Sequence, residues 1–212
     1  MKTIIGFGSL LSERSARTTS PNLSGFRTAR VKGYRRIFNK VGIVFIEKGI
    51  SDWSTKEVSS VATRKAEHID ILVTVFELPE EDMPQFYERE HKFRYIDVEY
   101  EELESGAIGT GIMCTEYSDQ AYRQERFQSE KEYYQKVGRF YDGKLWRNDI
   151  LPCRPYLKHC LAAAQKLSSK FYHNFLDSSF LADGTTSIRQ YLKQNPAILK
   201  EEHSLKDTRY IV

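Results

Sequence analysis

The sequence predicts an α+β fold, a small mixed or antiparallel β-barrel with flanking helices and a C-terminal helical extension. Short strand-like segments fill the first half of the chain, whereas an amphipathic helical pattern comes only after residue 150. Strands that come first and helices that come late, without regular βαβ alternation, favour this class over a doubly wound parallel sheet. We therefore expect residues 1–150 to form the barrel domain and residues 151–212 to pack as helices on the same core.

The strand candidates are short, rich in β-branched or aromatic residues, and separated by polar turns. The first covers residues 4–9 and runs into a turn that contains Gly6 and Gly8, because glycine permits a tight backbone. The others cover residues 29–38, 42–47, 58–63, 70–78, 94–102 and 108–115.

Four helices are predicted between and after these strands. Pro79 suits a first helical turn, and the acidic residues that follow it complement the helix dipole, so a short helix should end near Glu90. Ser118 or Asp119 can cap a second helix that continues to about residue 137. Residues 155–170 place apolar side chains on one helical face, and residues 186–192 resemble a short capped helix.

Charge and cysteine content narrow the class of partner. The net charge of +3 is the difference between 32 basic and 29 acidic residues, so we expect no nucleic-acid or membrane partner. No segment approaches the roughly 20 apolar residues that a membrane-spanning helix needs. Three cysteines without a CxxC pair indicate a reducing, cytoplasmic location, or an organelle if a transit peptide was removed. The five histidines lack metal-ligand spacing, so we expect no metal.

Two segments contain candidate reactive groups. The loop from Gly6 to Leu11 lacks the third glycine of a dinucleotide fingerprint. It offers successive backbone N–H groups and one hydroxyl at a strand end, a geometry that can hold a carboxylate or a polarised carbonyl oxygen, and a simple tight turn is the alternative.

The second segment, Glu88-Arg89-Glu90-His91, is the densest cluster of titratable groups. A carboxylate held in a pocket there could act as a general acid or base. A solvated helix end with an Arg–Glu pair is the alternative interpretation.

Three segments follow one another along the chain: Ile5-Gly6-Phe7-Gly8-Ser9-Leu10-Leu11, Val31-Lys32-Gly33-Tyr34-Arg35-Arg36-Ile37-Phe38-Asn39 and Phe86-Tyr87-Glu88-Arg89-Glu90-His91. In this order they resemble the γ-glutamylcyclotransferase superfamily, including its ChaC-like branch. In that family a YGSL or YGSN motif ends the first strand, a G-x-x-R-x-F strand follows, and a glutamate after a short helix is the acid/base. The resemblance covers roughly the first 120 residues. The remainder resembles an extension of uncharacterised members.

The resemblance implies a site and a reaction. Glu90 would be the catalytic acid/base, and Gly8, Ser9 and Leu10 would form the backbone cradle for a γ-glutamyl group. The substrate's own α-amine would attack its γ-carbonyl, releasing 5-oxoproline without a cofactor.

The chain also departs from the family pattern. Phe7 stands where the family usually has tyrosine, and Cys114 stands where a later-strand tyrosine is common, with Tyr117 as its substitute. Tyr95, in the bulky basic stretch after Glu90, completes the predicted substrate-binding set. These departures leave the identity of the substrate open: it could be glutathione, a smaller or different γ-glutamyl compound, or another amide.

Two further functions compete with this enzyme. One is a catalytically silent binding module for an acidic metabolite, with the C-terminal extension as a partner surface. The other is RNA or phosphate binding by the basic segment 27–40, although alternation along a strand would separate Arg35 from Arg36. We expect one of these two arginines to pair with an acidic neighbour and the other to lie in solvent.

Overall fold

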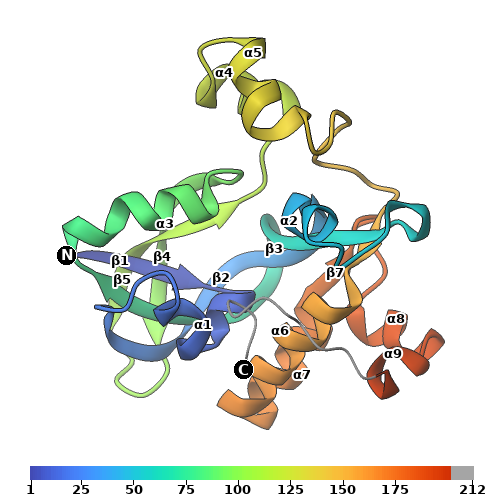
Figure 1. The fold of residues 1–212 in the computed structure, drawn as a ribbon. Coiled ribbons are helices and arrows are strands. Elements are labelled where there is room, and N and C mark those ends of the chain that lie inside the picture. The colour runs from blue at the N-terminus through green and yellow to red at the C-terminus, as the bar shows by residue number, and fades with distance from the viewer. Residues whose placement is uncertain (202–212) are drawn as a thin grey trace.

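In the computed structural model, which describes residues 1–201, seven strands form one mixed sheet in the order β6-β3-β1-β5-β4-β2-β7 (Figure 1). A further pairing between β2 and β3 closes β3, β1, β5, β4 and β2 into a five-stranded barrel. The predicted α+β class with a small barrel is therefore confirmed. The strands are β1 (Lys2–Gly6), β2 (Ser24–Val41), β3 (Glu57–Leu78), β4 (Arg94–Glu102), β5 (Ile108–Thr115), β6 (Leu151–Pro152) and β7 (Ser179–Leu181).

Strand directions bring distant parts of the chain to one edge of the barrel. β1 runs parallel to β5, so the carboxyl ends of both strands lie at the same edge. β4 is antiparallel to β5 and begins at this edge, where Arg94 lies opposite Thr115. β2 is antiparallel to β4, so its carboxyl end lies here as well. The loop after β1, the segment before β4 and the end of β2 therefore meet.

The α-helices are α1 (Glu13–Arg17), α2 (Ile43–Glu47), α3 (Met83–Glu90), α4 (Asp119–Arg126), α5 (Glu130–Tyr133), α6 (Arg154–Leu167), α7 (Ser169–Ser178), α8 (Ile188–Gln194) and α9 (Ala197–Lys200). In Figure 1, α1, α3, α6 and α7 lie beside the barrel strands, whereas α4 and α5 lie apart from them at the top of the view. A 3₁₀ turn, η1 (Ser9–Leu11), follows β1 directly, and α3 ends at Glu90 as predicted. Within residues 1–201 no helix is both long and apolar enough to cross a membrane.

The strand predicted over residues 42–47 is wrong, because this segment forms α2. The N–H of Gly42 still donates to the carbonyl of Val58, and the N–H of Phe45 then turns back to the carbonyl of Gly42. A short apolar run such as this one has no periodicity that separates a strand from a buried helical turn.

The strands predicted over residues 58–63 and 70–78 are one continuous strand, β3. Arg64 and Lys65 pair with Arg35 and Tyr34 of β2, and the register shift between Lys65 and Asp70 contains His68 with its positive φ of 65°. The helix predicted from Ser118 to residue 137 is also interrupted. Phe127 is extended, and the Ser129 side chain starts a new helix by accepting from the N–H of Glu132.

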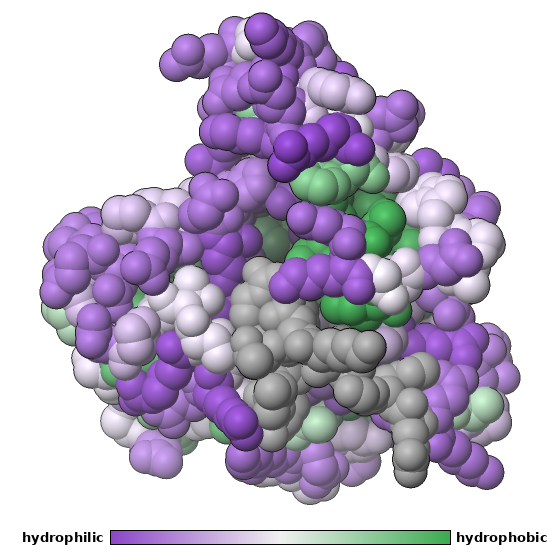
Figure 2. Space-filling model, viewed as in Figure 1, coloured by the Kyte–Doolittle hydropathy of each residue, from purple (hydrophilic) through white to green (hydrophobic). Residues whose placement is uncertain are grey.

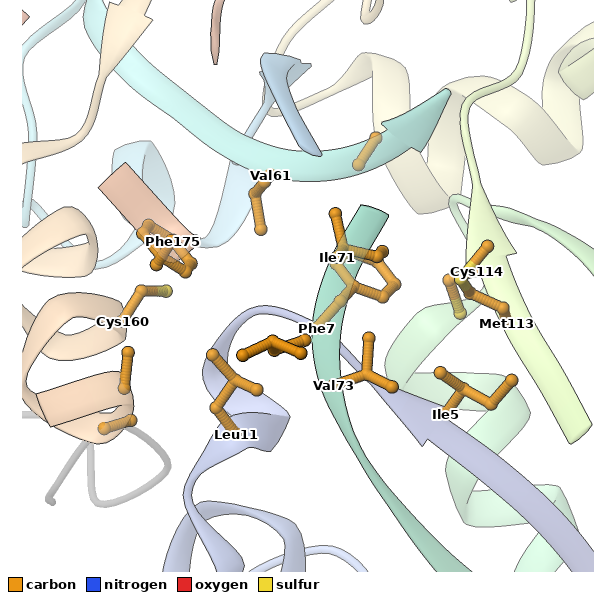
Figure 3. Close-up of a cluster of buried hydrophobic side chains, with 14 of the residues drawn as sticks. Ile5, Phe7, Leu11, Val61, Ile71, Val73, Met113, Cys114, Cys160 and Phe175 are labelled. Carbon is orange, nitrogen blue, oxygen red and sulfur yellow. The ribbon is translucent and has the colours of Figure 1, made fainter. Parts of the chain in front are cut away.

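The C-terminal helices share the main hydrophobic core with the barrel. In Figure 3, Cys160 of α6 and Phe175 of α7 lie on one side of a cluster that includes Leu11, Val61 and Ile71. The last part of the predicted segment 151–212, residues 202–212, lies outside the described residues.

The expectation for Arg35 and Arg36 is wrong. Arg36 is fully buried, and its hydrogen bonds go to backbone carbonyls, a hydroxyl and an amide oxygen. Arg35 donates to the carbonyl of Gly184 at 2.8 Å. Neither forms an ion pair with a described acidic residue, because the C-terminal segment covers this part of β2. The local sequence pattern around the two arginines gives no sign of that contact.

Candidate active site

A cavity of about 710 Å³ opens at the barrel edge where β1, β2 and β5 end. Hydrophobic side chains over α2 border a recess in an otherwise mostly hydrophilic face (Figure 2). The predicted residues Phe7, Gly8, Ser9, Leu10 and Glu90 all line the cavity. Its other polar lining residues include Lys40, Glu47, Lys48, Ser60, Glu88, Arg89, His91, Lys92 and Lys136.

The carboxylate of Glu90 is held by its neighbour in the chain. Arg89 Nε lies 3.0 Å from Glu90 Oε1, and these side chains are only 9% and 14% exposed. The alternative interpretation of this segment, an Arg–Glu pair at a solvated helix end, is therefore correct about the pair but wrong about the solvent, because the pair is largely buried. Oxygen Oε2 of Glu90 accepts no hydrogen bond from residues 1–201, which leaves this oxygen able to take a proton from a ligand.

Arg89 also connects the end of α3 to the first loop. Its Nη1 donates to the carbonyl of Ser15 at 3.0 Å and to Thr19 Oγ1 at 2.8 Å. Its Nη2 lies 3.3 Å from Ser9 Oγ. A planar guanidinium with several fixed bonds holds its partners in one geometry. Arg89 thus orients Glu90 relative to Ser9.

The carbonyl groups of the loop after β1 are used inside the protein. Arg36 Nε donates to the carbonyl of Phe7 at 2.7 Å, and Thr74 Oγ1 donates to that of Leu10 at 2.8 Å. The carbonyl of Gly8 accepts from the N–H of Leu11 at 3.0 Å. The first N–H groups of a helical turn have no acceptor within that turn. Among residues 1–201, no group accepts a hydrogen bond from the N–H of Ser9 or Leu10, so the described part of the chain leaves both to a ligand.

Gly8 is required at its position by lack of space. A Cβ atom there would lie 2.6 Å from Val61 Cγ1 and 2.8 Å from Tyr156 Oη. We expect Gly8→Ala to lower the free energy of unfolding by about 1–3 kcal/mol, because overpacking forces the loop or its neighbours to move. Urea unfolding measures this change, and a midpoint equal to that of the wild type would show that the loop accepts a methyl group.

Lys40, at the end of β2, is a cavity residue that sequence reasoning missed. The side chain is buried, with the residue only 6% exposed, and its Nζ lies 4.3 Å from the centre of the Phe93 ring. Burial, and then the ammonium of Lys92, lower the pKa of Lys40 to about 7, although the Glu90 carboxylate acts in the opposite direction. Its only sequence signal was its place just after the G-x-x-R-x-F strand.

His91 and Cys114 are poorly suited to ionic chemistry in this cavity. Burial, together with nearby cations such as Lys92, lowers the pKa of His91 to about 3, so its ring is neutral near pH 7. Its nitrogens lie 3.0 Å from Tyr122 Oη and 2.9 Å from Lys92 Nζ. Burial raises the pKa of the Cys114 thiol well above its ordinary value, which disfavours a thiolate nucleophile.

Two of the predicted substrate-binding residues lie outside the cavity, and a third has a second role. Tyr95 and Tyr117 are absent from the cavity lining formed by the described residues. Tyr95 Oη donates to the carbonyl of Tyr87 at 3.2 Å, and Tyr117 Oη donates to Glu125 Oε2 at 2.7 Å. Phe7 lines the cavity and also belongs to the main hydrophobic core (Figure 3).

Several solved structures resemble this chain. One, described as a "Gamma-glutamyl cyclotransferase", is 15% identical with a TM-score of 0.44, and the match covers 71% of this chain and 89% of that chain. An uncharacterized protein from Homo sapiens is 16% identical with a TM-score of 0.44, over 72% of this chain and 90% of that chain. A solution structure from Arabidopsis thaliana is 9% identical with a TM-score of 0.42, over 65% and 83%.

No protein-family model matches the sequence, and no curated protein matches it. The superfamily that the sequence motifs resemble is represented among the structures found. The fold class rests on the strand pairing of this chain, an α+β barrel closed between β2 and β3.

Proposed function

We propose that this chain is a γ-glutamylcyclotransferase-type enzyme that releases 5-oxoproline from a γ-glutamyl amine or peptide. One observation supports the proposal above all: the carboxylate of Glu90 and the turn that begins at Ser9 line the same cavity. A base and a set of backbone donors that face one space are what an intramolecular acyl transfer requires.

The reaction begins with the γ-glutamyl group bound in the cavity. Its α-amine attacks its own γ-carbonyl carbon, and Glu90 accepts the amine proton as the new C–N bond forms. The N–H groups of Ser9 and Leu10 stabilise the oxyanion that develops on the carbonyl oxygen. The nucleophile and the electrophile belong to the same substrate molecule. Holding that substrate bent, with its α-amine next to its γ-carbonyl carbon, therefore supplies much of the rate.

In the second step the tetrahedral intermediate collapses. The original γ-carbonyl C–N bond breaks, and Glu90 returns the proton to the departing nitrogen. The products are 5-oxoproline and a free amine, and Glu90 is again a carboxylate. The step consumes no water and requires no oxidant, reductant or metal-bound group to balance.

The test is an assay of 5-oxoproline with purified protein and a panel of γ-glutamyl amines, γ-glutamyl dipeptides and glutathione. We expect at least one substrate to give 5-oxoproline and free amine in equal amounts. If no substrate of the panel gave 5-oxoproline, while circular dichroism showed that the protein is folded, the proposal would be contradicted. It would then favour the silent binding module for an acidic metabolite, a reading that the buried cation Lys40 also supports.

A further inference from the structure

The cavity contains a buried positive group close to the proposed catalytic carboxylate. Lys40 comes from the end of β2, and Glu90 from the end of α3; both line the cavity, and the Glu90 carboxylate acts to raise the pKa of Lys40. They do not form an ion pair within residues 1–201, because Glu90 is paired with Arg89 and Lys40 Nζ lies over the Phe93 ring.

A buried ammonium without a carboxylate partner is costly, and an aromatic face offsets only part of that cost. In residues 1–201, no carboxylate lies within 4 Å of Lys40 Nζ. An anionic group of a ligand that entered the cavity would therefore gain a strong, poorly hydrated electrostatic partner. The site is built for a ligand that has at least one negative charge.

We propose that Lys40 binds the α-carboxylate of the substrate and so determines specificity for γ-glutamyl groups over other acyl amides. This inference rests on the proposed function. A γ-glutamyl group has its α-amine and its α-carboxylate on the same carbon. With the carboxylate on Lys40, the amine is only two bonds away, in the cavity that Glu90, the group that must take its proton, also lines.

The other cationic residues of the lining are less suited to this role. Lys136 is 61% exposed and lies 3.1 Å from Glu132, and Lys48 is exposed. Lys92 is partly exposed, with its Nζ 2.9 Å from His91. Arg89 already holds Glu90 and donates to the Ser15 carbonyl and to the hydroxyls of Thr19 and Ser9. Solvent screens exposed charges, so Lys40 has the strongest pull on an anion inside the cavity.

The proposal predicts a pH profile that a purely structural lysine would not give. The titratable groups around Lys40 are Glu90 at the end of α3, His91 and Lys92 just after it, and Cys114 on β5. His91 is neutral and the Cys114 thiol protonated near pH 7, so Lys40 itself is the group that changes charge there. KM for a γ-glutamyl substrate should be constant below pH 7 and rise up to about tenfold per pH unit above it.

The experiment compares two substrates in wild type and Lys40→Met. The first is a γ-glutamyl amide, and the second is the matching 4-aminobutyryl amide, which lacks the α-carboxylate and would close to 2-pyrrolidinone. We expect the wild type to prefer the first, and Lys40→Met to reduce this preference in kcat/KM by at least about tenfold, the equivalent of about 1.4 kcal/mol. Lys40→Arg should restore much of the preference, with a KM that no longer rises just above pH 7.

Calorimetric binding of L-glutamate separates this inference from the proposed function, because it needs no turnover. Loss of L-glutamate binding in folded Lys40→Met, but not in the control Lys136→Met, supports the carboxylate site even if no substrate gives 5-oxoproline. Equal L-glutamate affinity in wild type and Lys40→Met, or an unchanged substrate preference, would overturn the inference even if the enzyme is an active cyclotransferase.

Discussion

Glu90→Gln should lower kcat for 5-oxoproline formation by about 10²–10⁴-fold, the usual contribution of a general acid/base. Glutamine has nearly the size of glutamate but can neither accept the amine proton nor return it. KM should change little, because Lys40 and the backbone of Ser9 and Leu10 remain in place. Steady-state kinetics with the best substrate of the panel measures both constants.

Folding is not expected to confound this result. Arg89 loses its ion pair but keeps its bonds to Ser15 and Thr19, so the end of α3 stays attached to the first loop. Glu88→Gln is the matched control, since Glu88 lies on the same helix and borders the same cavity but is exposed. If Glu90→Gln retained kcat within tenfold of the wild type while Glu88→Gln lost it, the acid/base would be assigned to the wrong carboxylate.

Arg36→Met should lower the free energy of unfolding by about 2–4 kcal/mol, since unpaired buried polar groups cost about 1–3 kcal/mol each. The Arg36 guanidinium donates to the carbonyls of Phe7 and Leu72 and to Ser178 Oγ, and lies 4.8 Å from the centre of the Phe175 ring. Methionine fills similar space but leaves both carbonyls without a donor. Burial lowers the pKa of Arg36 to about 9, because a buried charge has lost its hydration. The variant no longer has this cost, which offsets part of the lost stability.

Urea unfolding of Arg36→Met and of Arg35→Met tests this assignment. Arg35 precedes Arg36 on β2 but is only partly buried, and its bond to the carbonyl of Gly184 lies near the surface. We expect Arg35→Met to cost less than about 1 kcal/mol, as is usual for partly exposed positions. Equal midpoints for the two variants would mean that the buried guanidinium does not hold the C-terminal helices to the barrel.

Local signals in the sequence were sufficient for part of the site. Pro79 and the acidic residues after it place the start of a short helix, and its end at Glu90 follows from the length of that helix. Gly6 and Gly8 indicate the turn after the first strand, because a tight turn favours glycine and glycine is visible in the sequence. Both features depend on a few neighbouring residues, which is why the sequence alone indicates them.

Lys40 and Arg36 could not be identified in the same way. Both belong to a basic stretch that, in isolation, resembles a solvated strand. Arg36 is covered by residues of α7 and Lys40 by Phe93, which all follow much later in the chain. The segment 42–47 is a second case. Its last hydrogen bond to β3 is made by Gly42, after which it turns into a helix, and a short apolar run contains no periodicity that would indicate this change. Residues whose environment is made by distant elements have no local pattern to indicate them.

The hydrogen bonds of Arg36 have a consequence for synthesis of the chain on the ribosome. The guanidinium that holds the carbonyl of Phe7 is itself held by Ser178 and by Asn174, whose amide also fixes the N–H of Leu72. The barrel strands emerge before these two partners, which lie 138 and 142 residues after Arg36 in the chain, so the strands can pair with one another first. The first loop therefore reaches its final geometry only after α7 has docked, and a nascent chain that has not yet reached α7 would have the barrel strands without the bonds that hold this loop.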